Sequence, residues 1–152
     1  MFLLDTDALS ISGPQSGYSG PEVDIWRSWV HWNSQRLFLS SVTIMEIRFG
    51  IEKAKAQGAT AKAARLGLWF VAFQANYGSR ILPVTAAIAD KAGDILCKAI
   101  HGGISPGTED AIIAATSMVH GFQLLSRNGR HMKPLGADWF DPLGPLPLAG
   151  PP

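Results

Sequence analysis

Short apolar runs alternate with longer helical segments along most of this chain. Apolar side chains throughout a run of this length are typical of strands buried on both faces of a sheet. Four such strands are predicted, at residues 2–5, 37–40, 80–83 and 123–126. Helices are predicted between them, at residues 22–34, 42–57, 59–77, 85–100 and 108–120. A weaker fifth strand is expected near Trp139 and Phe140.

Glycines and small polar residues mark the ends of these elements. Gly58, Gly78 and Gly121 follow predicted helices, where a helix stop is expected. Thr108 is the expected cap of the helix over residues 108–120. The Gly, Ser and Pro content of residues 12–21 predicts a loop.

Strands that alternate with helices predict an α/β domain with a parallel sheet and right-handed crossovers. In such a sheet the reactive site lies at the carboxyl edge, near the switch in strand order. We expect one domain over residues 1–141. Residues 142–152 hold five of the ten prolines and are expected to be extended over the surface or disordered.

The composition is that of a globular protein. Of its 152 residues, 47% are apolar and 16% are charged. Lys and Arg number 13 against 12 acidic residues, so binding of a polyanion would need a local basic patch. No signal peptide is visible, and the most apolar stretch, residues 66–73, is too short to span a bilayer. These features predict a soluble cytoplasmic protein.

The single cysteine, Cys97, excludes an internal disulfide and a thiolate cluster. Its apolar neighbours predict a buried structural thiol. The four histidines show no close metal-ligand spacing, which argues against a zinc site.

Three carboxylates lie in apolar surroundings. Asp5 ends the first strand, Glu46 lies in a helix among apolar residues, and Asp110 opens another apolar helix. Burial of one isolated carboxylate costs several kcal/mol unless it is paired or bound to a cation. We therefore expect the three to converge on a common metal ion.

Each of these carboxylates also has a purely structural interpretation. Asp5 is a possible N-cap, Glu46 is the fourth residue of a possible capping box that starts at Thr43, and Asp110 suits the first turn of its helix. Asp7 is expected to face solvent or to cap locally. Asp90 and Asp94 fit a solvated helix face, and Asp94 is spaced to pair with Lys98.

Ligation by carboxylates alone selects Mg²⁺ or Mn²⁺, and the chemistry that fits three acids is metal-assisted hydrolysis of a phosphodiester. Thr6 is placed to orient a water or a phosphate. Arg127, Arg130, His131 and Lys133 follow the fourth strand. Asn128, a fourth expected catalytic residue, would orient or neutralise phosphate oxygens together with Arg127 or Arg130. A second basic stretch contains Lys53, Lys55, Lys62 and Arg65, and either group is equally consistent with a solvated surface.

Four segments together resemble the PIN-domain nucleases of the VapC and FitB type, which are toxins of type II toxin–antitoxin pairs. They are residues 3–10 (LLDTDALS), 41–50 (SVTIMEIRFG), 108–115 (TEDAIIAA) and 124–132 (LLSRNGRHM). The resemblance implies a three-layer sandwich with a short parallel sheet of four to five strands flanked by helices. It covers the chain up to about residue 142.

The same resemblance implies a Mg²⁺- or Mn²⁺-dependent endoribonuclease in which Asp5, Glu46 and Asp110 are the acidic ligands. Asn128 stands where many members carry a fourth acid, which leaves open whether one metal ion or two are bound. Asp7 stands where an asparagine is usual. The resemblance also implies a homodimer that is silenced by a cognate VapB-like antitoxin.

Trp26, Trp29 and Trp32 recur every three residues in the second helix. Core packing and a protein interface both explain such a spacing. We expect at least one of the three to contact an antitoxin or a second subunit.

Two other functions compete with the nuclease. Asp5-Thr6-Asp7 matches the nucleophile motif of haloacid-dehalogenase-like phosphatases, although the later acidic pair of that family is missing. A non-catalytic interaction module of the same fold is the second alternative, and Asn128 is its best support.

Overall fold

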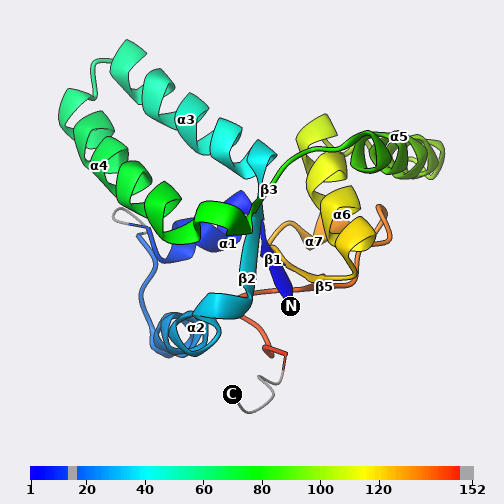
Figure 1. Ribbon diagram of the computed structural model, residues 1–152, viewed down its shortest axis with the longest axis horizontal. Coiled ribbons are helices and arrows are strands. Elements are labelled where there is room, and N and C mark those ends of the chain that lie inside the picture. The colour runs from blue at the N-terminus through cyan, green and yellow to red at the C-terminus, as the bar shows by residue number, and fades with distance from the viewer. Residues whose placement is uncertain (14–16, 148–152) are drawn as a thin grey trace.

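A five-stranded parallel sheet runs through the centre of the computed structural model, which describes residues 1–13 and 17–147 (Figure 1). The strand order is β3-β2-β1-β4-β5, and every neighbouring pair is parallel. The strands are β1 (Phe2–Leu4), β2 (Leu37–Ser40), β3 (Ile81–Leu82), β4 (Gln123–Leu125) and β5 (Trp139–Phe140). All five lie where the sequence predicts them, and they are short, with two to four residues each.

Seven α-helices connect these strands within the described residues. They are α1 (Thr6–Ile11), α2 (Pro21–Trp32), α3 (Ser41–Ala56), α4 (Thr60–Tyr77), α5 (Ala86–His101), α6 (Thr108–His120) and α7 (Gly129–Met132). Two short 3-10 helices, η1 (Ser34–Arg36) and η2 (Gly78–Arg80), precede β2 and β3. The predicted stops are confirmed, since Gly58, Gly78 and Gly121 all follow helix ends with positive φ.

The alternation of side chains along each strand divides the core into two halves. Phe2 and Leu4 point to the face of the sheet that α1, α2, α3 and α4 cover, whereas Leu3 points to the face that α5, α6 and α7 cover. On β4, Leu125 and Leu124 make the same division. The strands are apolar throughout because both of their faces are buried, and the result is the three-layer arrangement that was expected.

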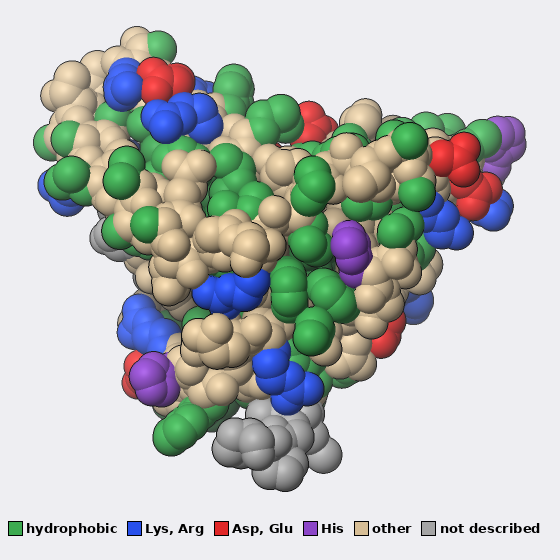
Figure 2. Space-filling view, in the orientation of Figure 1, with side chains coloured by type: hydrophobic (Ala, Val, Ile, Leu, Met, Phe, Trp, Pro, Cys, Tyr) green, Lys and Arg blue, Asp and Glu red, His purple; other side chains and the backbone are tan. Residues whose placement is uncertain are grey.

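The α3–α4 pair and the α5–α6 pair extend away from the sheet on opposite sides (Figure 1). Charged side chains gather at the outer parts of these pairs (Figure 2), where Glu52 is paired with Lys55 and Asp94 with Lys98, both at 2.9 Å. Asp94 therefore belongs to a solvated helix face, as predicted. No helix among the described residues is long and apolar enough to cross a membrane.

Part of the proline-rich tail lies on the core. The indole Nε1 of Trp29 donates a hydrogen bond to the carbonyl oxygen of Pro147 at 3.0 Å, and Leu143 and Leu146 pack against the cluster formed with α1 to α4. Residues 142–147 are therefore ordered against the core, and the expectation of disorder does not hold for them. Residues 148–152 lie outside the described residues.

The tryptophans of α2 divide between core and surface. Trp26 and Trp29 are buried and stack at 5.7 Å between ring centroids, whereas the side chain of Trp32 is 79% exposed. Core packing thus explains two of the three. An interface at Trp32 remains a prediction.

The prediction of a buried Cys97 was wrong, because this thiol is exposed. Ile88, Ala92, Ile95 and Ala99 form the buried stripe of α5. Cys97 lies two positions after Ile95, and two residues turn a helix by about 200°, which places Cys97 almost opposite the buried face. Apolar neighbours in the sequence therefore did not decide its exposure.

A close contact fixes the start of α7. A Cβ atom at Gly129 would lie 2.3 Å from Cη2 of Trp139, closer than side chains pack, so only glycine fits beside this indole.

We expect Gly129→Ala to lower the free energy of unfolding by about 1–3 kcal/mol through overpacking. Gly93, inside α5, has no atom within 4 Å of its Cβ position. As the matched control, Gly93→Ala should stabilise the protein by about 0.5–1 kcal/mol. Urea unfolding of both variants checks this, and equal stability of the two would contradict the assigned contact.

Candidate active site

The candidate site lies where the strand order switches. β1 is the central strand, with β2 on one side and β4 on the other, so the connections leave it in opposite directions. Asp5 directly follows β1, and Ser126 directly follows β4. The hydroxyl of Ser126 donates to Oδ2 of Asp5 at 2.7 Å, across this switch point. The predicted carboxyl edge is therefore where the first acid lies.

Asp5 is also the N-cap of α1. Its Oδ1 accepts a hydrogen bond from the backbone N–H of Thr6 at 2.7 Å, and its side chain is only 5% exposed. The structural interpretation of Asp5 as a cap is thus correct. A cap needs one oxygen and no burial, however, and Asp5 has both oxygens bonded and is enclosed. Capping alone does not explain this carboxylate.

Glu46 lies beside Asp5 through Thr6. The hydroxyl of Thr6 donates to Oε2 of Glu46, which joins α1 to α3. The predicted capping box at Thr43 was wrong, because α3 begins at Ser41 with Ser40 as its N-cap. β2 runs directly into the helix, so Glu46 falls in the second turn, and its carboxylate faces the site instead of the helix end.

Asp110 lies in the first turn of α6, as predicted, but the N-cap is Gly107 and not Thr108. Its Oδ2 accepts from the backbone N–H of Gly107 at 3.3 Å. The same carboxylate contacts Nδ1 of His131 at 2.7 Å and accepts from Nδ2 of Asn128 at 3.3 Å. Asp110 therefore has the capping role and also connects α6 to the segment that follows β4.

Asn128 links Asp110 to Asp5. Its backbone N–H donates to Oγ of Ser126 at 3.0 Å, and that hydroxyl donates to Asp5. Hydrogen bonds thus connect Asp5 to Glu46 through Thr6, and Asp5 to Asp110 through Ser126 and Asn128.

Asp7 was expected to face solvent or to cap locally, and that prediction was wrong. Its two oxygens accept from the backbone N–H of Arg127 at 3.1 and 3.0 Å, and the hydroxyl of Ser126 lies 3.4 Å from it. Asp7 is on the first turn of the six-residue helix α1, so it stands beside Asp5 at the same sheet edge. The sequence did hold a signal for this role, because Asp7 is a second acid only two positions after Asp5, which ends the strand.

Residues 126–131 were expected at this edge, but the contacts of Ser126 with Asp5 and of His131 with Asp110 were not predicted, and Tyr18 was missed. Ser126 had the same signal as Asp5, a polar residue that directly ends a buried strand. His131 lies three positions after Asn128, the spacing that places two residues on one helix face. Arg127 and Arg130 are exposed at this edge, with Nη1 of Arg127 bonded to the hydroxyl of Tyr18 at 2.6 Å. Nothing in the sequence around Tyr18 pointed to the site.

The carboxylates act on one another electrostatically. Burial, and then the charge of Asp7, raise the pKa of Asp5 from 3.8 to about 7, while the hydrogen bond from Ser126 opposes the rise. Burial also raises the pKa of Asp7 and of Glu46, and the charges of Asp110 and Glu109 raise that of Glu46 further. Mutual repulsion of this kind needs a compensating positive charge if all of these groups are to be ionised.

The donor set suits a hard divalent cation, because it consists of carboxylate oxygens with an asparagine and hydroxyls around them. As the side chains lie, no three His, Cys, Asp or Glu residues of the described chain are arranged as a metal site. Glu46 is engaged by Thr6, and Asp110 by Asn128 and His131. The chemistry and the shared electrostatics fit a cation, and hydrogen bonds hold the side chains of Glu46 and Asp110 in their present orientations.

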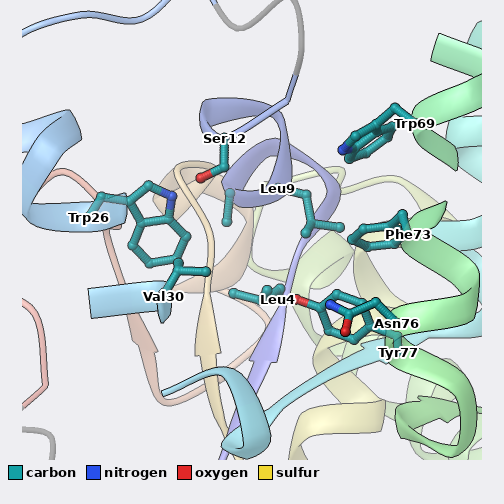
Figure 3. Close-up of a pocket in the computed structure, with 10 residues that line it drawn as sticks. Leu4, Leu9, Ser12, Trp26, Val30, Trp69, Phe73, Asn76 and Tyr77 are labelled. Atoms are coloured by element: carbon teal, nitrogen blue, oxygen red, sulfur yellow. The ribbon is translucent and has the colours of Figure 1, made fainter. Parts of the chain in front are cut away.

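An apolar groove lies beside the acids. Its volume is about 190 Å³; Trp26 and Val30 enter it from α2, Trp69 and Phe73 from α4, and Leu9 from α1 (Figure 3). A second pocket of about 250 Å³ shares Leu9 and Trp69 with the groove and has Thr6 and Glu46 on its wall. Apolar surface thus continues from the groove to the acidic residues.

The raised pKa of Asp5 predicts how stability depends on pH in the absence of metal. The folded-state pKa lies above the unfolded value of 3.8, so the folded protein binds the proton more tightly. Stability should be greatest below about pH 4 as far as this group is concerned, and it should fall as the pH rises through about 7. In EDTA at pH 7.5, Asp5→Asn should raise the free energy of unfolding by about 1–3 kcal/mol.

Urea unfolding at pH 5 and pH 7.5 measures this effect, which should be smaller at pH 5. Asp94→Asn is the control, because Asp94 is exposed and its pKa is lowered by its hydrogen bond with Lys98. A loss of stability in Asp5→Asn at pH 7.5 would contradict the assigned electrostatics.

Comparison with known proteins identifies the family. The family model of the PIN domain matches residues 20–134. VapC ribonuclease Y4jK of Sinorhizobium fredii is 30% identical over 111 residues, which are 73% of this chain and 78% of that protein. A chain of FitAcB from Neisseria gonorrhoeae has a similar fold, with a TM-score of 0.74, 22% identity and coverage of 93% of this chain and 98% of its own. A chain of DNA-bound VapBC from Salmonella typhimurium is also similar, with a TM-score of 0.72 and 22% identity; the match covers 93% of this chain and 97% of that one. With its parallel sheet, its acidic carboxyl edge and a matching family model over most of its length, this chain belongs to the PIN domain family.

Proposed function

We propose that this protein is a divalent-metal-dependent endoribonuclease that acts as the toxin of a toxin–antitoxin pair. The observation that carries the proposal is the acidic edge, where Asp5 is buried with a raised pKa and is connected by hydrogen bonds to Glu46 and Asp110. The relative at 30% identity is named a VapC ribonuclease, which supports the same activity here. The phosphatase alternative rested on the match of Asp5-Thr6-Asp7 to a nucleophile motif, and membership of the PIN domain family argues against it.

Asp5, Glu46 and Asp110 would hold Mg²⁺ or Mn²⁺. When bound, such a cation lowers the pKa of a coordinated water and neutralises charge on a phosphodiester. The other residues of the site fix these carboxylates: Ser126 orients Asp5, Thr6 orients Glu46, and His131 with Asn128 orients Asp110. Partners of this kind keep ligand oxygens in place and usually matter for affinity and rate.

Phosphate recognition falls to the basic residues of the same edge. Arg127 and Arg130 are exposed there and offer guanidinium donors to the non-bridging oxygens of a phosphodiester. Overall charge is nearly balanced, so these local donors are what would attract RNA to an acidic site. Unpaired strands suit such an open edge better than a duplex, whose bases are already stacked and paired.

Removal of one ligand tests the activity. Asp110→Asn should lower the rate of cleavage of a single-stranded RNA by at least about a hundredfold. It should also weaken Mn²⁺ binding in titration calorimetry, while the unfolding curve stays close to that of the wild type. Asp90→Asn, an exposed acid on α5, is the matched control and should keep the wild-type rate. Wild-type cleavage by Asp110→Asn would exclude its proposed role, and absence of metal binding by the wild type would favour the non-catalytic module.

We further propose that the partner is a VapB-like antitoxin with an apolar segment in the groove of Figure 3. The similar structures named FitAcB and VapBC support such a partner. The groove supports it because it presents Trp69 and Leu9 next to Glu46, so that a bound segment would also cover the acids. The homodimer remains a prediction, and the exposed Met45 and Phe49 of α3 are apolar surface that a second copy would cover.

Two neighbouring residues of α4 test the groove. Trp69→Gln should weaken binding of the co-expressed product of the adjacent reading frame by about tenfold or more, because it removes aromatic area from both pockets. Leu68→Gln is the matched control, since Leu68 is 77% exposed and lines neither pocket. Titration calorimetry measures both affinities. An unchanged affinity of Trp69→Gln would place the partner elsewhere.

A further inference from the structure

The backbone of Arg127 is fixed at the acidic edge. Both oxygens of the half-buried Asp7 accept from its N–H, at 3.1 and 3.0 Å, so movement of the residue away from the end of β4 would break both contacts. Burial raises the pKa of Asp7, and the positive charge of Arg127 opposes part of that rise. The arginine and this carboxylate are therefore held next to each other at the mouth of the site.

The side chain of Arg127 is fixed separately, by Tyr18. Nη1 donates to the phenol oxygen of Tyr18 at 2.6 Å, and Cζ lies 5.1 Å from the centroid of the same ring. One tyrosine thus contacts the guanidinium through both its hydroxyl and its π face. Tyr18 provides the only side-chain partner of this guanidinium within the described part of the chain, so its other N–H groups remain available.

Tyr18 is itself anchored. It lies in the loop between α1 and α2, is half-buried and packs against the core on the α1–α4 face of the sheet. Gly17 and Gly20 on either side of it have φ values of +61° and +121°, which allow the chain to turn inward at this residue. The ring is consequently a fixed platform for the arginine, although 109 residues separate the two in sequence.

A fixed arginine has a particular value at this site. Asp5, Asp7, Glu46 and Asp110 repel a phosphate, so the approach of RNA depends on the few cations at the edge. A free arginine loses rotamer freedom when it binds a phosphate, whereas one already held by a ring and a hydroxyl has less to lose. Preorganisation of this kind increases affinity without adding a new contact to the ligand.

We infer that Tyr18 is a positioning residue for the substrate, which holds the guanidinium of Arg127 in the orientation that contacts a phosphate of single-stranded RNA. The inference rests on the proposed ribonuclease function. Tyr18 does not touch the reacting atoms; it acts through Arg127, by one hydrogen bond and one cation–π contact. Loss of the hydroxyl should therefore weaken RNA binding and leave the chemical step unchanged.

Tyr18→Phe tests this inference, because it removes the hydroxyl and keeps the ring that packs on the core. With a fluorogenic single-stranded RNA and Mg²⁺, KM should rise roughly threefold to tenfold while kcat stays within about a factor of two. The Kd of the same oligonucleotide, from fluorescence anisotropy in EDTA at low salt, should rise by a similar factor. Thermal unfolding confirms that the variant is folded.

A double-mutant cycle separates positioning from a merely structural effect. Arg127→Gln should raise KM and Kd by itself, and Tyr18→Phe should then add nothing in the Arg127→Gln background. Arg27→Gln removes an exposed arginine of α2, paired with Asp24, and is the control for loss of one positive charge.

Each outcome decides the inference. Wild-type KM and Kd in Tyr18→Phe, or an equal effect of Tyr18→Phe with and without Arg127, would overturn it and leave the ribonuclease function intact. A wild-type protein that cleaves no RNA would overturn the proposed function, and the anisotropy comparison would still decide whether Tyr18 and Arg127 act together on RNA. Absence of RNA binding by the wild type would overturn both.

Discussion

The structure depends on the burial of a carboxylate, Asp5, at the end of β1, where the strand order of the sheet switches. Asp5 ends the central strand, and the hydroxyl of Ser126 from the neighbouring strand closes over it. This hydrogen bond crosses between two strands that lie more than a hundred residues apart in sequence, and it holds the ends of β1 and β4 together. Asp7, Asn128 and Arg127 all bond to groups that this contact positions.

The site is organised around the cost of that burial. Burial and the repulsion between neighbouring carboxylates make ionisation of these acids unfavourable. The hydrogen bonds from Ser126, Thr6 and the backbone of Arg127 offset only part of that free-energy cost. A core without these acids would be more stable, and this is a usual property of sites that bind charged ligands. The surrounding apolar core, close-packed on both faces of the sheet, is what allows such a site to persist.

Much of the fold follows from the sequence because the local signals agree with one another. Buried strands read as apolar runs, the helices between them end at glycines, and a parallel sheet leaves few possible topologies. The errors arose where a one-dimensional pattern has two solutions. Thr43 to Glu46 matches a capping box, but the hydroxyl of Ser40 starts the helix three residues earlier, because β2 ends there. Cys97 has apolar neighbours, yet helix rotation carries it to the surface.

The sequence alone determined that Asp5 follows a strand, that Asp110 opens a helix and that Glu46 lies in the helix after the second strand, since periodicity and element order fix those places. Only the tertiary structure decided which polar groups meet them. Asp7, Ser126, His131 and Tyr18 join the site through contacts between segments distant in sequence, and hydrogen-bond partners at such separations depend on how helices and strands dock. Docking is set by the shape of the packed core, and no local pattern in the chain encodes that shape.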